Sequence, residues 1–154
     1  MKRSLFTLLV VGALLTAMAS ADDAKDEAIK KDREQIQGVW QVVSLVIDGN
    51  EAAKDDAKKL SVVNGADGTW NLRNGNMEVS QGDSTIDPTQ KLKTIDFTPT
   101  KGESKGDRFF GIYELGQNSR KLCFAPAGKE RPTEFSSRSG SQHILVTFER
   151  EKAK

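Results

Sequence analysis

The stretch GVWQVVSLVIDG, residues 38–49, decides the fold class of this chain. Residues 39–47 are rich in β-branched side chains and contain no proline, which is typical of a strand. Because side chains alternate along a strand, the even-numbered residues from Trp40 to Val46 should share one face and the odd-numbered residues the other. The Asp48-Gly49 pair then predicts a turn. The chain therefore opens its folded region with a long β-strand.

The same alternation recurs downstream between turn signals. Asn74-Gly75 predicts a two-residue hairpin turn of type I′, which needs a positive φ at both central positions. The further strands expected are 60–63, 69–73, 77–79, which residues 84–86 extend or follow, and then 94–98, 109–115, 121–125 and 144–149. Together with 39–47 these are about eight strands joined mostly by short turns, so neighbours in sequence should pair in the sheet.

This order predicts an all-β fold, an eight-stranded antiparallel up-and-down barrel, since closure removes unpaired strand edges. An immunoglobulin-like sandwich is the alternative. It would need long crossover connections, and only residues 126–142 are long enough to supply one. We expect a short, highly charged N-terminal helix at 24–37 that is ended by Gly38, and a second short helix at 51–60 after the first strand.

A family resemblance rests on "GVW" (Gly38-Val39-Trp40), which follows the predicted helix, and on Arg150 just after the last apolar alternation. This pattern is similar to that of the lipocalins and the wider calycin group. The resemblance implies that Trp40 closes the barrel floor and that Arg150 packs across its indole as a cation–π lid.

Residues 33–151 also resemble an uncharacterised family of exported domains abundant in planctomycete bacteria. The stretches that carry this likeness are GVWQVVSLVIDG, TIDFTPTKG, GIYEL and KLCFAPAGKERPTEFSS. The resemblance implies export and does not imply a specific function.

The N-terminus has the pattern of a cleaved signal peptide. Lys2 and Arg3 make the first residues basic, residues 5–17 are almost entirely apolar, and Ala19-Ser20-Ala21 is a small-residue cleavage site. The apolar run is shorter than the roughly 20 residues of a membrane-spanning helix. We therefore predict a signal peptide at 1–21, a charged helical leader at 22–37, a lipocalin-like domain at 38–151, a secreted or periplasmic location and no transmembrane anchor.

The charge balance and the cysteine count of the mature chain exclude some kinds of binding partner and of covalent cross-link. Removal of 21 of the 154 residues leaves 133, with 21 basic and 22 acidic side chains, because Lys2 and Arg3 leave with the signal. This balance argues against binding of nucleic acid, which needs a concentrated basic surface. Cys123 is the single cysteine, so no internal disulfide can form. We expect Cys123 to be half-buried as a small apolar side chain, and we expect a monomer.

Residue types that commonly act in catalysis or bind metals are scarce in this sequence or lack the required spacing. His143 is the single histidine, which rules out a His-rich metal site, and there is no G-x-S-x-G sequence around which to build a serine hydrolase triad. The carboxylates are scattered, so no catalytic pair is fixed at a defined separation. We therefore name no catalytic residue, no metal ligand and no cofactor, and an enzyme is not expected.

Binding remains the leading prediction. An eight-stranded barrel either fills itself with side chains or holds one small molecule. We expect a small, partly apolar or amphiphilic ligand contacting Trp70, Phe97, Tyr113, Phe124 and Arg131. If those aromatic side chains fill the barrel, the alternative is an envelope protein with a structural or protein-interaction role.

The long segment 126–142 allows two interpretations. In one, it is a rim loop that turns Arg131 toward an anionic group of the ligand. In the other, it is a connector in which Arg131 pairs with Glu134 or Glu114 and Phe135 plugs the end of the barrel.

Overall fold

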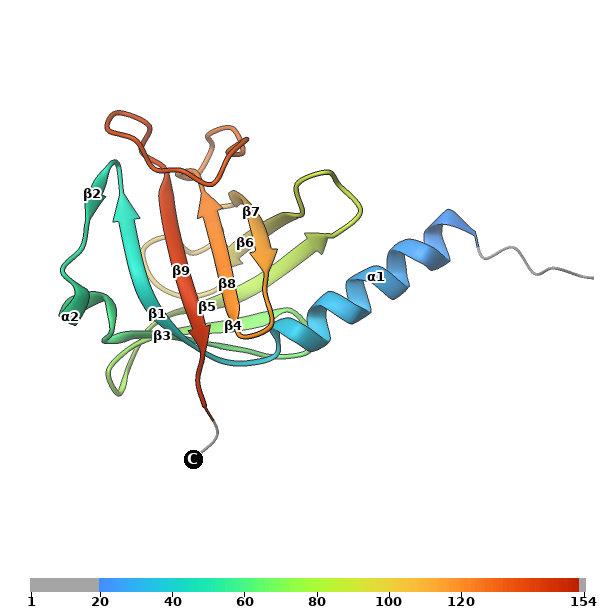
Figure 1. The fold of residues 1–154 in the computed structure, drawn as a ribbon, viewed down its shortest axis with the longest axis horizontal. Coiled ribbons are helices and arrows are strands. Elements are labelled where there is room, and N and C mark those ends of the chain that lie inside the picture. Colours follow the sequence, from blue (N-terminus) through green and yellow to red (C-terminus); the bar gives the residue numbers. More distant parts are fainter. Residues whose placement is uncertain (1–19, 153–154) are drawn as a thin grey trace, which may run out of the picture.

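A computed structural model describes residues 20–152, which form two helices and nine strands (Figure 1). The predicted signal peptide lies almost wholly outside this range. The elements are α1 (Ala21–Ile36), β1 (Gly38–Ile47), β2 (Asn50–Glu51), α2 (Lys54–Ala57), β3 (Leu60–Asn64), β4 (Thr69–Asn74), β5 (Met77–Asp87), β6 (Thr94–Pro99), β7 (Phe109–Leu115), β8 (Ser119–Phe124) and β9 (Ile144–Arg150).

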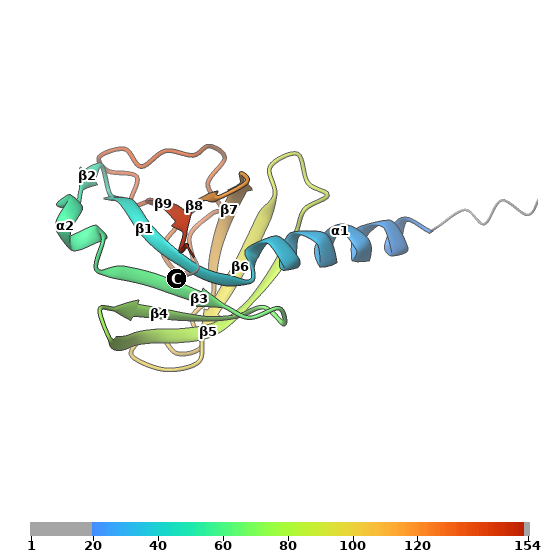
Figure 2. The same ribbon diagram turned by 60° about the horizontal axis from the view of Figure 1, so that its bottom comes forward.

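A single antiparallel sheet closes on itself. Its strand order is β2-β1-β3-β4-β5-β6-β7-β8-β9, and β1 also pairs with β9 from Trp40 opposite Arg150 to Ile47 opposite Ile144. β2 is a two-residue extension paired with the end of β1, so eight strands form the barrel seen in Figure 2. The predicted eight-stranded up-and-down barrel is confirmed, as are both helices, although the second is only four residues long.

The β4–β5 hairpin lies where the sequence predicts it, but its turn is one residue later. Asn74 pairs with Met77, so Gly75 and Asn76 are the two central residues. Gly75 has a φ of 60°, and Asn76 is not among the residues with positive φ. A positive φ at the first position alone fits a type II′ turn, so the type I′ prediction is wrong.

A β-bulge divides the first strand. The register of β1 against β9 shifts between Val42 and Ser44. Val42 and Leu45 both face the barrel interior as a result, because the extra residue reverses the alternation. The simple odd–even assignment is therefore right for the first half of β1 and wrong for the second.

The floor of the barrel forms where α1 meets β1. Trp40 is completely buried, and its Nε1 donates to the carbonyl oxygen of Ile36 at 2.8 Å. The Arg150 guanidinium lies 4.3 Å from the Trp40 ring and donates to the carbonyl oxygens of Gln35 and Gln37. The Trp40–Arg150 pair implied by the lipocalin resemblance is confirmed, and it also holds the end of α1.

A buried polar cluster fixes α1 a second time. Asp32 is only 3% exposed and accepts hydrogen bonds from the Tyr113 hydroxyl and Lys93 Nζ, each at 2.8 Å. The next residue, Arg33, donates to the Ser84 hydroxyl at 2.9 Å and to the Ser84 carbonyl oxygen at 2.7 Å. The charged helix projects from the barrel, yet its C-terminal half is tied to β5 and β7 (Figure 1).

Candidate ligand-binding cavity

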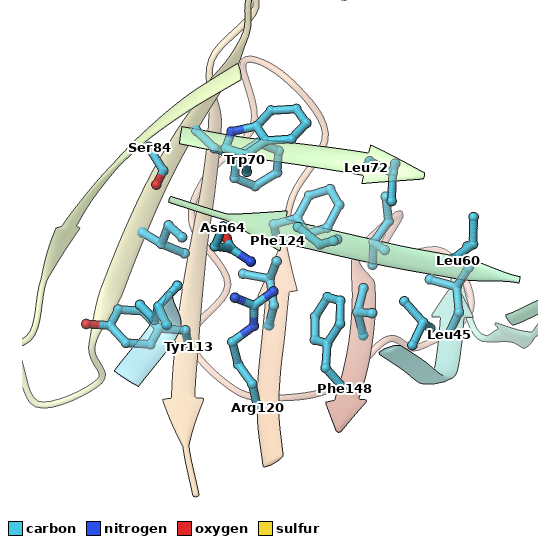
Figure 3. A pocket seen from close by; sticks show the side chains of 18 residues that line it. Leu45, Leu60, Asn64, Trp70, Leu72, Ser84, Tyr113, Arg120, Phe124 and Phe148 are labelled. Atoms are coloured by element: carbon cyan, nitrogen blue, oxygen red, sulfur yellow. The ribbon is translucent and has the colours of Figure 1, made fainter. Parts of the chain in front are cut away.

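The barrel contains a partly open cavity of about 230 Å³ (Figure 3). All eight strands of the barrel contribute side chains to it, and Ile36 of α1 closes its floor. Fourteen of the eighteen lining residues are apolar, and the four polar ones are Asn64, Ser84, Tyr113 and Arg120. The apolar lining consists of Ile36, Val42, Leu45, Leu60, Val62, Trp70, Leu72, Ile95, Phe97, Leu122, Phe124, Ile144, Val146 and Phe148.

The four aromatic residues predicted to contact a ligand all line this cavity. Phe97 is central among them, with its ring centroid 5.9 Å from that of Trp70 and 4.9 Å from that of Phe124, both in edge-on geometry. Phe97 also stacks at 5.1 Å on Phe109. These contacts hold the aromatic wall in one arrangement and leave the rest of the interior open.

Tyr113 presents its ring to the cavity and turns its hydroxyl away (Figure 3). The hydroxyl donates to Asp32. Burial, together with the hydrogen bond to Asp32 and its charge, raises the pKa of Tyr113 well above its usual value. The neutral phenol therefore serves as a fixed donor to α1 and is not available to a ligand.

The structure places Arg131 on the outside of the barrel. Its Nη2 lies 2.6 Å from Asp96 Oδ1, and its Nη1 donates to the carbonyl oxygens of Ile95 and Gly111. Asp96 lies between two cavity-lining residues of β6 and therefore faces outward. Arg131 is thus a strut on the outer wall, as in the connector interpretation, but its partner is Asp96, whereas Glu134 pairs with Arg138.

The rest of segment 126–142 also packs against the wall. The Cys123 thiol lies 3.4 Å from the carbonyl oxygen of Ser136. Ser137 Oγ accepts from the Gly49 amide at 3.1 Å, and the Gln142 amide donates to Asp48 at 2.8 Å. The long loop is held on both sides by side-chain and backbone contacts, which fits a connector.

Three polar lining residues were not predicted from the sequence: Asn64, Ser84 and Arg120. Arg120 is the one that carries a charge. It is 7% exposed, and its guanidinium lies between two aromatic rings, 4.3 Å from Phe148 and 5.0 Å from Trp40. Figure 3 shows the guanidinium pointing toward the side chain of Asn64 across the cavity. Its position follows from the alternation of β8, because Arg120, Leu122 and Phe124 share the inward face.

The charge of Arg120 has no anionic partner among residues 20–152. Its side chain makes no hydrogen bond or ion pair there, and its Nε is buried without an acceptor. Burial, and to a lesser extent the like charge of Arg150, lowers the pKa of Arg120 to about 9. Asn64 Nδ2 is a second buried donor without an acceptor. The cavity therefore contains two unused donors in an apolar surrounding.

Metal-binding clusters and membrane-spanning helices are both absent from the described residues 20–152. Within residues 20–152, no three His, Cys, Asp or Glu side chains are grouped so that they could hold a metal ion. In the same part of the chain, no helix has the length and apolar character that crossing a membrane requires. The cavity is therefore an apolar site whose unpaired polar groups are the Arg120 guanidinium and the Asn64 amide.

Comparisons with protein-family models, curated proteins and solved structures found no match for this chain.

Proposed function

We propose that this chain is an exported, lipocalin-like barrel that binds a small, partly apolar ligand in its interior. The observation that carries the proposal is the cavity of about 230 Å³ that remains although Trp70, Phe97, Tyr113 and Phe124 all point into the barrel. A barrel with only a structural role would be expected to fill that space, because protein interiors pack to crystal-like density and voids are destabilising.

The size of the cavity restricts the ligand. It exceeds the engineered apolar cavity of about 150 Å³ that binds benzene, and it is below the roughly 300–1,000 Å³ of pockets for drug-sized molecules. A ligand with on the order of ten non-hydrogen atoms is therefore the expected size. A larger molecule would have to extend beyond the cavity.

Export rests on the N-terminal sequence and on the resemblance to exported planctomycete domains. The predicted cleavage point lies between Ala21 and Asp22, one residue inside α1. Cleavage there removes Ser20, whose hydroxyl accepts from the Asp23 amide at 3.2 Å. N-terminal sequencing of protein from the envelope or medium should begin at Asp22. Sequence beginning at Met1 would contradict the export proposal.

A cavity-filling substitution tests ligand binding. Val62 faces the cavity, whereas Val63 is on the opposite face of the same strand. Val62→Phe should abolish binding of 1-octanol and octanoate measured by isothermal titration calorimetry, and Val63→Phe should leave it unchanged. Thermal melts of both variants check that they are folded.

Two results would contradict the proposal. One is that wild-type protein binds neither octyl compound. The other is that both valine variants bind them as the wild type does, because the ligand would then lie outside the cavity. Native mass spectrometry of protein purified from its own envelope would identify the natural ligand.

A further inference from the structure

The polar groups of the cavity divide into those that already have partners and those that do not. The Tyr113 hydroxyl donates to Asp32. The Ser84 hydroxyl accepts from Arg33 and donates to the Gly68 carbonyl oxygen at 2.9 Å. Arg120 and Asn64 remain, and each presents a buried donor nitrogen with no acceptor in the described part of the chain.

The two buried atoms without a partner, Arg120 Nε and Asn64 Nδ2, are both donors, so the group that they lack is an acceptor. A buried charge without a counter-charge is strongly unfavourable, and native proteins rarely keep one. The rings of Trp40 and Phe148 compensate part of the charge of Arg120 through cation–π contacts, but they accept no conventional hydrogen bond. A negatively charged oxygen acceptor would satisfy the guanidinium and the amide together.

We infer that the cavity takes a carboxylate-bearing amphiphile head first, with the carboxylate on the Arg120 guanidinium and the Asn64 amide and the hydrocarbon chain among the apolar residues. The inference rests on the proposed function, since it names the ligand class of the same cavity. Figure 3 shows Leu45, Leu60 and Leu72 away from Arg120, where the chain would lie. Planar guanidinium suits this head group because it can donate two parallel hydrogen bonds to a carboxylate.

The apolar lining distinguishes this ligand from a free inorganic or short-chain anion. Fourteen apolar side chains surround the two donors, and each buried methylene of a ligand contributes about 0.8 kcal/mol to binding, equivalent to roughly a fourfold gain in affinity. A chain of about eight carbons fits the size expected from the cavity volume. Octanoate is therefore a suitable probe, and acetate is its counterpart with the same head and almost no chain.

The first experiment varies the head group and the chain length of the probe. Octanoate, 1-octanol, octylammonium and acetate are titrated into the wild-type protein at pH 7.5 by calorimetry. We expect octanoate to bind at least tenfold more tightly than 1-octanol, since hydrogen bonds to a charged group are worth about that factor or more. Octylammonium should show no measurable binding, because it brings a second positive charge to Arg120. Acetate should bind at least a hundredfold more weakly than octanoate.

The second experiment removes the charge. Arg120→Met should lose the preference for octanoate, binding it at least tenfold more weakly than the wild type does and no more tightly than it binds 1-octanol, because the carboxylate then has no counter-charge. Lys121→Met is the matched control, because Lys121 is the exposed neighbour on the other face of β8, and it should keep the wild-type preference. Asn64→Leu provides a second test at the other donor and should weaken octanoate severalfold with little effect on 1-octanol.

The outcomes separate the two proposals. Equal binding of octanoate and 1-octanol by the wild type would overturn the head-first carboxylate while supporting an apolar ligand. An unchanged octanoate preference in both Arg120→Met and Asn64→Leu would overturn it as well. Acetate binding as tightly as octanoate would assign the donors to a small anion and contradict the amphiphile. Absence of binding by both octyl compounds would refute the proposed function itself.

Discussion

Replacing Arg120 by Met should stabilise the unliganded protein. The substitution keeps an unbranched side chain against Trp40 and Phe148 and removes a charge that has no anionic partner in the described chain. The pKa of Arg120 is lowered from the usual arginine value to about 9, which corresponds to a cost on the order of 5 kcal/mol for holding the charged form. The two cation–π contacts offset part of this cost, because one cation–π contact that is shielded from water contributes about 2 kcal/mol. We therefore expect a net gain of about 1–3 kcal/mol.

The sign of the pH dependence follows from the same shift. The folded state binds the Arg120 proton less tightly than the unfolded state, so the destabilisation is fully present below pH 9 and declines as pH rises above about 9 toward the usual pKa of arginine. The advantage of Arg120→Met over the wild type should therefore be largest near neutral pH and should shrink above pH 9. Urea unfolding at pH 7 and pH 10 measures it, with Lys121→Met as the control.

The expected thermal shift is easily measured. For a domain of this length, each kcal/mol corresponds to roughly 4 °C in Tm, so Arg120→Met should melt several degrees higher than the wild type at pH 7. A Tm lowered by several degrees, with Lys121→Met unchanged, would refute the reasoning. It would show that the guanidinium is a structural strut whose ring contacts outweigh its desolvation.

Three further predictions concern the floor, the wall and the helix anchor. Trp40→Ala should lower the free energy of unfolding by about 3–5 kcal/mol, and Arg150→Ala should lower it by less. Urea unfolding of the double variant should show that the two effects are coupled, and strictly additive effects would mean that the stacking of the two side chains contributes nothing. Cys123 is fully buried, and burial raises the pKa of its thiol. The thiol should therefore not react with a thiol reagent until the protein is denatured. Rapid labelling of the folded protein would contradict the packing of segment 126–142 against the barrel wall. Tyr113→Phe removes a donor from buried Asp32 and should cost about 1–3 kcal/mol, whereas an unchanged urea midpoint would show that Lys93 alone satisfies the carboxylate.

Local patterns were enough to predict the barrel. β7, at Phe109–Leu115, has the predicted bounds because its alternation is uninterrupted and the turn after it is short. Closure could be anticipated from the tryptophan–arginine pair at the two ends of the sheet. The bulge in β1 was not predictable, since the residues around Val43 are all good strand formers and only the pairing with β9 creates the shift.

The candidate site was predicted only in part, for two physical reasons. The aromatic lining follows from large side chains at inward positions. Arg120 was missed because the expected strand began at Lys121, although extending the alternation of Phe124 and Leu122 by two residues would have pointed it inward. The pairing of Arg131 with Asp96 joins residues 35 positions apart, and a single sequence carries no local signal for such a contact.

A crystal structure of the wild-type protein grown with saturating octanoate tests the central claim most directly. We expect octanoate inside the barrel, with its carboxylate within hydrogen-bond distance of the Arg120 guanidinium and Asn64 Nδ2 and its chain directed toward Leu45 and Leu60. An interior without octanoate, or octanoate bound with its carboxylate among the leucines, would contradict it.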